Sequence, residues 1–336
     1  MSILLVVEAA KAGTDRRQNH LLPFGDGTVL STALTRLAPY GEGPVVVAIS
    51  DLADDQEIEE IATANGASAV KGPSEDMLGR FVEVIADYPA EHLVRVTVDS
   101  PLVDHHLVAD VVDAHLRSGA DYTTNSLLRT HPTGLEVEVI RSDALLDAAE
   151  QATTPEERAG VTTFVKRRPA SYKLHAALAS GDFEDHDWRI HDTTSQSAMM
   201  ALVTSAGGDY SAPWHSYVEH SPLPEDAPPI RLRVARENVA ASVSALTDTI
   251  GNLPDPLPIG DPSRRSWGVW VAPGLIGAIT VSIQNGWGTL AANFVESLDE
   301  ALAEQILHLV DDRLMADDQV LALTIDGSRI RPYRET

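Results

Sequence analysis

Short apolar runs rich in β-branched residues alternate with helical patterns of apolar positions through the first half of the chain. The predicted strands are Ile3–Val7, Val45–Ile49, Ala69–Val70, Leu93–Val98, Tyr122–Thr124 and Gly134–Ile140. The predicted helices are Val29–Leu37, Asp55–Asn65, Met77–Tyr88, Leu107–Ser118, Ser142–Ala152 and Thr194–Ser205. This alternation is typical of a doubly wound sheet with helices on both faces. The sequence therefore predicts an α/β fold with a Rossmann-like, three-layer, mostly parallel sheet.

The pattern changes after the last of these helices. Residues 207–228 are rich in Gly, Ser and Pro and are predicted to form a linker between a domain over 1–206 and a second domain over 229–336. The second domain is predicted to contain strand Ile230–Val234, helix Arg236–Ile250, strands Trp267–Val271 and Leu275–Ile283, helix Leu290–Leu314 and strand Val320–Ile325. That order is the one found in ferredoxin-like α+β domains. We expect this domain to serve self-association or the binding of a partner, because such a sheet has edges that must be covered.

Composition narrows the possible partners. The 336 residues include 50 acidic and 25 basic ones, for a formal charge of −25, which disfavours binding to nucleic acid or to anionic membranes. There is no cysteine, so disulfides and thiolate sites are excluded. The uncharged stretch Ser266–Val295 contains Pro273, Gln284 and Asn285, and it is interpreted as buried strands and turns rather than a membrane helix. The apolar start is followed at once by Glu8, which indicates a first strand and a cytoplasmic protein.

Two carboxylates are candidates for a metal site. The apolar run Leu93–Val98 is followed directly by Asp99, and ligands of open α/β sheets bind at the carboxyl ends of strands. Asp192 follows the short run Trp188–Ile190 and opens a helix. Mg²⁺ near phosphates is held by one or two carboxylates together with water, so these two would suffice. Each aspartate could equally be a helix N-cap. Three histidines, at positions 105, 106 and 186, are interpreted as surface residues, because no metal-ligand spacing connects them.

Three segments in chain order carry a resemblance to a known family. This chain has Arg95–Asp104, Thr133–Val139 and His191–Gln196. Members of the cytidylyltransferase family of acidic-sugar and spore-coat polysaccharide biosynthesis typically have Arg-Ile-Thr-Ala-Asp-Cys-Pro-Leu-Ile-Asp, Arg-Gly-Leu-Asp-Val-Glu-Val and Leu-Asp-Thr-Pro-Glu-Asp at these places. Further similar segments are Ala48–Asp51, Gly72–Phe81, Gly119–Tyr122 with Asn125, and Pro155–Arg158 with Val161 and Thr162. The resemblance covers about residues 3–205 and implies the GT-A, or nucleotide-diphospho-sugar transferase, fold.

The resemblance also implies a reaction. An oxygen of a sugar or sugar acid would attack the α-phosphorus of a nucleoside triphosphate, of which CTP fits the resemblance best, and pyrophosphate would leave while Mg²⁺ neutralises the developing charge. Asp99 and Asp192 would hold the metal. The residues implied to bind nucleotide or substrate are Gly13, Thr14, Ser50, Asp76, Arg80, Arg95, Asn125, Glu136, Glu138 and Arg158. A homo-oligomer is expected.

The N-terminal loop departs from the family pattern. Family members usually have Arg-Met-Gly-Ser-x-Arg-Leu-Pro-Gly-Lys there, and this chain has Ala10, Asp15 and Asn19 in place of the two arginines and the lysine. The remaining basic residues of the loop, Lys11, Arg16 and Arg17, are the candidates for catalytic positive charge.

Two alternatives to catalysis by the family mechanism stay open. One is a catalytically degenerate domain that acts as a binding or regulatory protein. The other is a GT-A glycosyltransferase, for which Asp185-His186-Asp187 is a poor match to the expected Asp-x-Asp motif.

Overall fold

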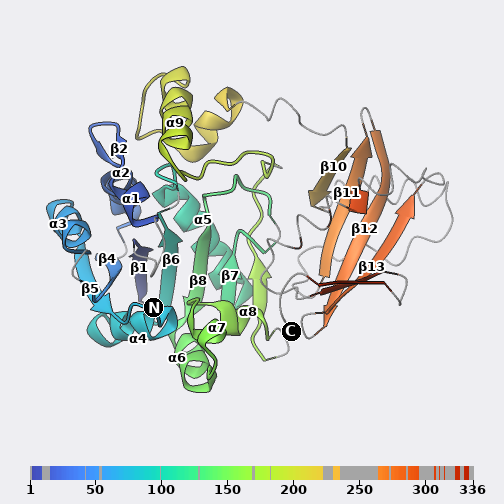
Figure 1. The fold of residues 1–336 in the computed structure, drawn as a ribbon, viewed down its shortest axis with the longest axis horizontal. Helices are drawn as coiled ribbons and strands as arrows, with labels where there is room; N and C mark the ends of the chain where they lie inside the picture. The colour runs from blue at the N-terminus through green and yellow to red at the C-terminus, as the bar shows by residue number, and fades with distance from the viewer. Residues whose placement is uncertain are drawn as a thin grey trace. The chain divides into compact units, whose positions relative to one another are not determined.

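The structure is a computed structural model, and its chain divides into two compact units (Figure 1). One comprises Met1–Val165 and Ala170–Pro224, and the other Lys166–Pro169 and Glu225–Thr336. In the first unit the structure describes residues 2–9, 16–41, 43–52, 55–98, 100–127, 129–165, 171–181 and 183–221. In the second it describes residues 166–168, 230–234, 264–271, 274–284, 287–294, 306–307, 310, 314, 322–325 and 329–332.

A mixed sheet of seven strands forms the centre of the first unit, in the order β5-β4-β1-β6-β8-β7-β9 (Figure 1). The strands are β1 (Ile3–Glu8), β4 (Val45–Ser50), β5 (Ser68–Gly72), β6 (His92–Thr97), β7 (Tyr122–Thr124), β8 (Val137–Arg141) and β9 (Leu174–Ala176). Strands β5, β4, β1 and β6 are parallel, β8 is antiparallel to both of its neighbours, and β7 and β9 are parallel to each other. The predicted α/β fold with a mostly parallel sheet is confirmed.

Helices cover both faces of this sheet. The alternate positions Ile3, Leu5 and Val7 of β1 belong to a core shared with α2 (Val29–Leu37), α3 (Gln56–Ala64), α5 (His105–Ser118) and α9 (Thr193–Ser205). The other face packs against α4 (Met77–Asp87) and α6 (Ser142–Gln151); the short helix α7 (Pro155–Arg158) contacts α4, and α8 (Thr163–Lys166) follows it in sequence. Because side chains alternate between faces along a strand, and Arg95 pairs in register with Val6 and Glu138, the side chains of Glu8, Arg95 and Glu138 fall on the same face.

Short elements and helix caps complete the first unit. The short elements are α1 (Arg16–Leu21), β2 (Pro23–Phe24), β3 (Gly27–Thr28) and the 3₁₀ helices η1 (Ala38–Tyr40) and η3 (Trp214–His220). An aspartate opens each of α4, α5 and α9 and accepts a backbone N–H of the first turn: Asp76, Asp104 and Asp192. A carboxylate at this position satisfies a donor that the helix leaves free and interacts favourably with the helix dipole.

Residues 207–221, which the sequence placed in a linker, pack within the first unit. Trp214 and Tyr217 are buried in its core, and the Trp214 N–H donates to the Asp104 carboxylate at 2.6 Å. The buried Arg36 guanidinium also donates to Asp104, at 3.3 Å, and to the backbone carbonyl of Tyr210 at 2.5 Å. The buried aromatic residues explain why this Gly- and Ser-rich segment is ordered: they contribute apolar burial that a linker lacks.

The second unit contains a six-stranded sheet in the order β10-β11-β12-β13-β14-β15. These strands are β10 (Ile230–Val234), β11 (Arg264–Val271), β12 (Gly274–Gln284), β13 (Trp287–Phe294), β14 (Ala322–Ile325) and β15 (Arg329–Pro332). Neighbours are antiparallel except β13 and β14. A ferredoxin-like domain would place its first and last strands side by side, whereas β10 lies at one edge and β14 and β15 at the other. The ferredoxin-like prediction is therefore wrong for the described strands.

The helix predicted at Leu290–Leu314 begins later than expected. Residues 290–294 belong to β13, while the described residues 306, 307, 310 and 314 are helical. Short apolar runs fit either a strand or a buried helix, so periodicity alone does not separate them. The buried residues Ile306, Val310 and Leu314 have the spacing of one helix face. The helix predicted at Arg236–Ile250 lies outside the described residues.

The uncharged stretch after Ser266 forms strands, as predicted: its described residues belong to β11, β12 and β13. In the described part of the chain, no helix is long and apolar enough to cross a membrane.

Candidate functional site

The carboxyl ends of β1, β4, β5 and β6 meet at one edge of the sheet, since these strands are parallel and adjacent. Glu8, the last residue of β1, pairs in register with Ala48 on one side and Thr97 on the other. Ligands of open α/β sheets bind at this edge. Four of the predicted site residues follow these strand ends in sequence but lie outside the described residues: Lys11, Gly13, Thr14 and Asp99. The described residues near these strand ends therefore define the geometry of the site.

Arg95 lies at the centre of a buried network of charged residues. Its Nε is 2.7 Å from Oε2 of Glu8, and its Nη1 is 2.5 Å from Oε2 of Glu138. Tyr122 donates to Oε1 of Glu138 at 2.7 Å, and Thr162 donates to the same oxygen at 3.1 Å. The side chains of Glu8 and Glu138 are 4% and 5% exposed, against 15% for Arg95. The structure thus connects the predicted residues Arg95 and Glu138 through direct contact across β6 and β8.

The positive charge of Arg95 and the negative charges of Glu8 and Glu138 neutralise one another in this network. Burial disfavours the guanidinium charge, but the carboxylates of Glu8 and Glu138 raise the pKa of Arg95 above its ordinary value. Burial, followed by the charge of Glu138, raises the pKa of Tyr122 well above its ordinary value. Arg95 therefore stays charged and Tyr122 stays a hydrogen-bond donor. The sequence prediction missed Glu8, although a single acidic residue closing an otherwise apolar strand could have indicated it.

The loop that follows β5 is held in place by three charged residues, Asp76, Arg80 and Arg158. Asp76 caps α4 through Oδ1, while its Oδ2 accepts from Nη2 of Arg158 at 2.6 Å. The fully buried Arg80 donates to the carbonyls of Pro73 and Ser74 at 2.9 and 3.2 Å. These contacts fix the loop at the edge of the sheet.

Ser50 and Asn125 hold two further loops. The Ser50 N–H donates to Oδ2 of Asp55 at 2.9 Å, and the Ser50 hydroxyl donates to the same oxygen. The buried Asn125 donates to the carbonyl of Leu135 at 2.7 Å and accepts from the N–H of Val137 at 2.9 Å, so it closes the connection between β7 and β8. Both residues are buried and form their hydrogen bonds within the protein.

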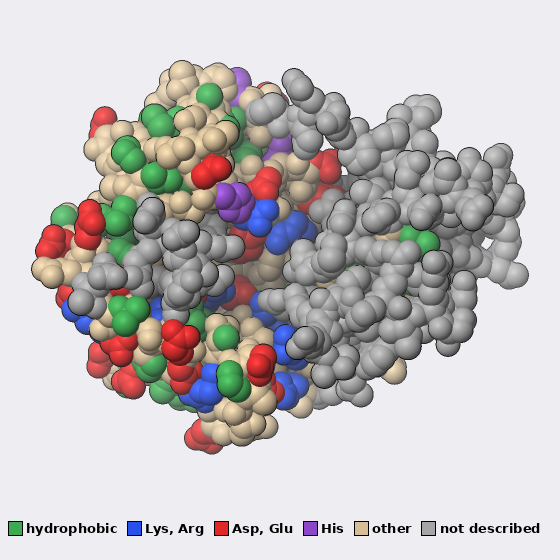
Figure 2. Space-filling model, in the orientation of Figure 1, with side chains coloured by type: hydrophobic (Ala, Val, Ile, Leu, Met, Phe, Trp, Pro, Cys, Tyr) green, Lys and Arg blue, Asp and Glu red, His purple; other side chains and the backbone are tan. Residues whose placement is uncertain are grey.

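Gly134 brings separate segments of the site together. Its φ of +104° is in the region that favours glycine, and a Cβ built there would lie 3.1 Å from Cβ of Ser100 and 3.1 Å from the backbone N of Arg189. The neighbouring Thr133 accepts from the N–H of Trp188 at 2.8 Å. Side chains of Asp or Glu, Lys or Arg, and His gather near the middle of the first unit in Figure 2. Two of the segments that carry the family resemblance, Arg95–Asp104 and Thr133–Val139, therefore meet at Gly134, and Trp188 and Arg189, just before the third segment, join them there.

Glu136 and Arg129 form an ion pair on this turn. Nη1 of Arg129 is 2.5 Å from Oε1 of Glu136, and the Gly134 N–H lies 3.0 Å from Oε2. The two side chains are 22% and 21% exposed. Sequence analysis predicted Glu136 but missed Arg129, because only the folded turn places position 129 against position 136.

Asp192 lies at the exposed start of α9, next to α1. Its Oδ1 accepts from the N–H of Ser195 at 2.8 Å, so the N-cap interpretation is correct. This hydrogen bond lowers the pKa of Asp192, which keeps the carboxylate ionised. Asn19 of α1 donates from Nδ2 to the carbonyl of His191 at 3.0 Å, and Gln196 of α9 donates to the carbonyl of Pro23. Two contacts thus join the segment after β1 to the segment of Asp192. Arg16 and Arg17 lie in α1, where the structure describes only their backbone.

The donor set at Asp192 fits a magnesium ion bound partly by phosphate. Asp192 offers an ionised, accessible carboxylate, and Mg²⁺ usually keeps water ligands and takes one or two carboxylates beside phosphate oxygens. Within the described ranges there is no group of three or more His, Asp or Glu side chains arranged to hold a metal ion. A metal cage made of protein ligands alone is therefore not present in that part of the chain.

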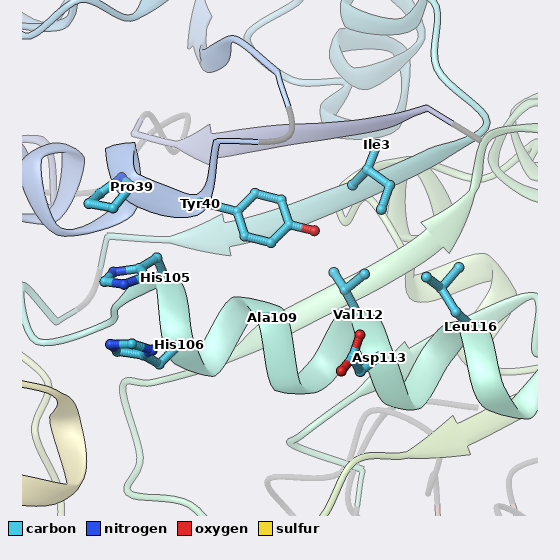
Figure 3. A pocket seen from close by; sticks show the side chains of 9 residues that line it. All are labelled: Ile3, Pro39, Tyr40, His105, His106, Ala109, Val112, Asp113 and Leu116. Carbon is cyan, nitrogen blue, oxygen red and sulfur yellow. The ribbon is translucent and has the colours of Figure 1, made fainter.

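A cavity of about 270 Å³ lies along α5 and reaches the amino end of β1 (Figure 3). Its lining runs from His105 and His106 at the start of α5 to Leu116 near its end, and includes Ile3, the first residue of β1. The imidazole rings of His105 and His106 are 3.9 Å apart beside this opening. Because Ile3 is at the opposite end of β1 from Glu8, this cavity is not the nucleotide site.

Of the three histidines expected at the surface, His186 is buried, with 8% of its area exposed. Burial lowers its pKa, so it is neutral at physiological pH.

Comparison with known proteins decides the family. The model of the cytidylyltransferase family matches residues 21–200, more than half of the chain. This chain belongs to the cytidylyltransferase family. The membership supports nucleotidyl transfer, and the matched residues, apart from 166–169, lie within the first unit.

Individual relatives agree with this assignment. The spore coat polysaccharide biosynthesis protein SpsF of Bacillus subtilis is 27% identical over 213 residues, which are 61% of this chain and 88% of that protein. The uncharacterized protein MJ1063 of Methanocaldococcus jannaschii is 30% identical over 178 residues, covering 52% of this chain and 71% of that one. The solved structure of a cytidylyltransferase from Leptospira borgpetersenii has a TM-score of 0.60 at 24% identity, and the match covers 65% of this chain and 93% of that one. The last likeness confirms the fold of the first unit.

Proposed function

We propose that the protein transfers the cytidylyl group of CTP to a sugar or sugar acid, with Mg²⁺, and releases pyrophosphate. The observation that carries the proposal is the contact of α1 with the segment of Asp192, through Asn19 and the carbonyl of His191 at 3.0 Å. It joins α1, which follows β1 in sequence, to the segment that carries the exposed carboxylate of Asp192. Family membership supplies the class of reaction.

The chemistry follows from that arrangement. An acceptor oxygen forms a bond to the α-phosphorus while the bond to the pyrophosphate oxygen breaks, and the acceptor proton passes to solvent or to a base at the site. Asp99 and Asp192 would hold Mg²⁺, which supplies neutralisation of the negative charge on the phosphates. Lys11, Arg16 and Arg17 would add positive charge, with Gly13 and Thr14 in the same loop.

Position 16 is a more suitable phosphate contact than position 17. Residues three apart lie on the same side of a helix, so position 16 of α1 lies on the side of Asn19, which contacts His191. We expect Arg16→Ala to raise the KM for CTP more than Arg17→Ala does. Equal effects would argue that the loop, rather than one face of α1, binds the triphosphate.

The ion pair of Arg129 and Glu136 is our candidate for the acceptor side. It is partly exposed, it lies on the turn of Gly134 beside Ser100, and it offers both donors and acceptors to sugar hydroxyls. The name of the B. subtilis relative, which refers to polysaccharide biosynthesis, is consistent with a sugar acceptor.

The direct test is pyrophosphate release with each of the four nucleoside triphosphates and a panel of sugars, sugar phosphates and sugar acids, with and without Mg²⁺. We expect release with CTP only, dependent on Mg²⁺. In Asp192→Asn the helix cap is retained, because asparagine caps as well as aspartate, but the anionic ligand is lost. Its kcat should fall by about 10- to 100-fold or more, with thermal stability nearly unchanged.

Asp143→Asn is the matched control, since Asp143 is an exposed aspartate of the first turn of α6 and pairs with Arg141 on the surface. Its activity should equal that of the wild type. No release with any triphosphate, together with no thermal stabilisation by CTP and Mg²⁺, would contradict the proposal and favour a non-catalytic binding protein.

A further inference from the structure

We propose that Asn19 is a positioning residue that fixes the orientation of Asp192 relative to α1. The inference rests on the proposed function, because it concerns the same metal and nucleotide. Asn19 is uncharged, so it cannot neutralise phosphate. Its side-chain amide instead donates to the carbonyl of His191 at 3.0 Å.

The peptide group between His191 and Asp192 is held from both sides. Its carbonyl accepts from Asn19, and its N–H donates to Oγ of Ser195 at 3.0 Å. The N–H of His191 donates to the same Oγ at 2.9 Å. A peptide group is planar, so fixing its C=O and its N–H fixes the plane, and with it the position of the Asp192 Cα from which the side chain leaves the backbone.

The two partners of this peptide group come from different elements. Ser195 belongs to α9, the same helix that Asp192 caps, and would hold Asp192 wherever α9 moved. Asn19 belongs to α1, and its contact holds the peptide group of Asp192 in place relative to α1. The second link between these elements, from Gln196 to the carbonyl of Pro23, reaches the chain beyond the end of α1 and keeps the two elements adjacent without touching the Asp192 peptide group.

Positions 16 and 19 of α1 would therefore have different roles: position 19 orients Asp192, and position 16 contacts phosphate. Position 16 is on the same side of the helix one turn earlier, so a shift of α1 against α9 would change the separation of Arg16 from Asp192. Metal ligands depend on outer partners for orientation, and losing such a partner typically weakens metal binding by about 10- to 100-fold. The Asn19 contact would have this effect on Asp192 through the backbone.

The experiment compares Asn19→Ala and Asn19→Leu with the full-length wild type. Leucine keeps the branched shape of asparagine and removes the hydrogen-bonding groups of its amide. The control is Asn65→Ala, because Asn65 is also half-buried and donates from Nδ2 to a backbone carbonyl, that of Ile61, at 2.8 Å, at the end of α3. Two quantities are measured: amide hydrogen exchange of residues 192–196 in the absence of any ligand, and the affinity for Mn²⁺ in the presence of CTP by electron paramagnetic resonance.

Both Asn19 variants should accelerate exchange at 192–196 and weaken Mn²⁺ binding by about tenfold, whereas Asn65→Ala should change neither. The KM values for CTP and for the metal should rise, and the KM for the acceptor should stay the same. Unchanged exchange in both variants would overturn the inference at its structural step. Faster exchange with unchanged Mn²⁺ affinity would overturn the positioning role alone. If the wild type binds neither Mn²⁺ nor CTP, the proposed function fails and the positioning role fails with it, while faster exchange would still identify the backbone contact.

Discussion

Two groups of charged residues in the first unit are built differently. The network of Arg95, Glu8 and Glu138 is buried, and its charges neutralise one another at 2.5–2.7 Å. Asp192, in contrast, is exposed and is held through backbone contacts. The resemblance to one family pointed to residues of both groups. Their surroundings separate them: the first group forms its contacts within the protein, whereas the carboxylate of the second is exposed to solvent.

The strongest test of this difference is to remove the central charge of the buried network. Arg95→Met should lower the free energy of unfolding at pH 7 by about 3–5 kcal/mol, because it leaves two buried carboxylates without their cation. Urea denaturation at pH 7 measures this loss. Arg141→Met is the control: Arg141 pairs with Asp143 on the surface, and losing such a pair costs about 0–1 kcal/mol.

The loss in Arg95→Met should also depend on pH. Without the guanidinium, the carboxylates of Glu8 and Glu138 are buried together without a cation, and their mutual repulsion destabilises the folded state. Protonation removes this repulsion, so the variant should recover stability relative to the wild type as the pH falls from 7 to 5. A loss of equal size at both pH values would show that Arg95 acts through packing rather than charge.

The turn at Gly134 contacts Arg189, three residues before Asp192, and tests how tightly the exposed group is held. Gly134→Ala should lower the free energy of unfolding by about 1–3 kcal/mol, because φ is +104° and the new Cβ would press against Ser100 and the backbone of Arg189. Activity should also fall at temperatures where the variant is still folded, since Ser100 and the chain before Asp192 meet there. Thermal unfolding and kcat are the measurements.

The control for that substitution is Gly119→Ala. Gly119 has a φ of +58°, and a Cβ there would meet nothing within 4 Å, so it isolates the backbone cost. If the two variants lose equal stability and equal activity, close packing at Gly134 does not shape the site.

A third buried polar group, without a carboxylate, extends the comparison. His115 contacts His92 at 3.0 Å and Thr123 at 2.9 Å. Burial first, then the neighbouring His92, lowers the pKa of His115 to about 4. A histidine that is neutral when folded but protonates near 6.5 when unfolded favours the unfolded chain as the pH falls, so stability should decrease between pH 6.5 and 4.

After allowance for solvent, the His115 contribution should be about 1–2 kcal/mol at pH 4.5. Urea midpoints of the wild type and of His115→Gln at pH 7 and pH 4.5 measure it. The variant should lose less stability than the wild type on acidification. An identical loss would place the acid sensitivity elsewhere, for example in carboxylates such as those around Arg95.

The sequence predicted the scaffold better than the contacts. Six of the seven strands of the first sheet, all except β9, could be predicted because apolar runs and helical patterns alternate locally, and Asp192 could be placed at a helix start from the cap pattern. The contact partners of these residues could not be predicted. Glu138 faces Arg95 only because β8 lies beside β6 in the sheet, and Asn19 contacts His191 across 172 positions of sequence. The predicted order of strands in the second unit was wrong for the same reason. Element order along a chain does not state which strands pair.

The smallest predicted effect concerns Arg129, whose ion pair with Glu136 is intermediate between the two groups, at 22% exposure. If the pair binds the acceptor, Arg129→Met should raise the KM for the acceptor by about tenfold, which corresponds to roughly 1.4 kcal/mol of lost binding, and leave the KM for CTP unchanged. If it only braces the turn, stability should fall and both KM values should move together, because Gly134 and Ser100 would shift with it. Steady-state kinetics with each substrate varied in turn separates the two cases, with Arg141→Met as the surface control. The first result would place the acceptor at the Gly134 turn, and the second would assign this pair to the scaffold together with Arg95.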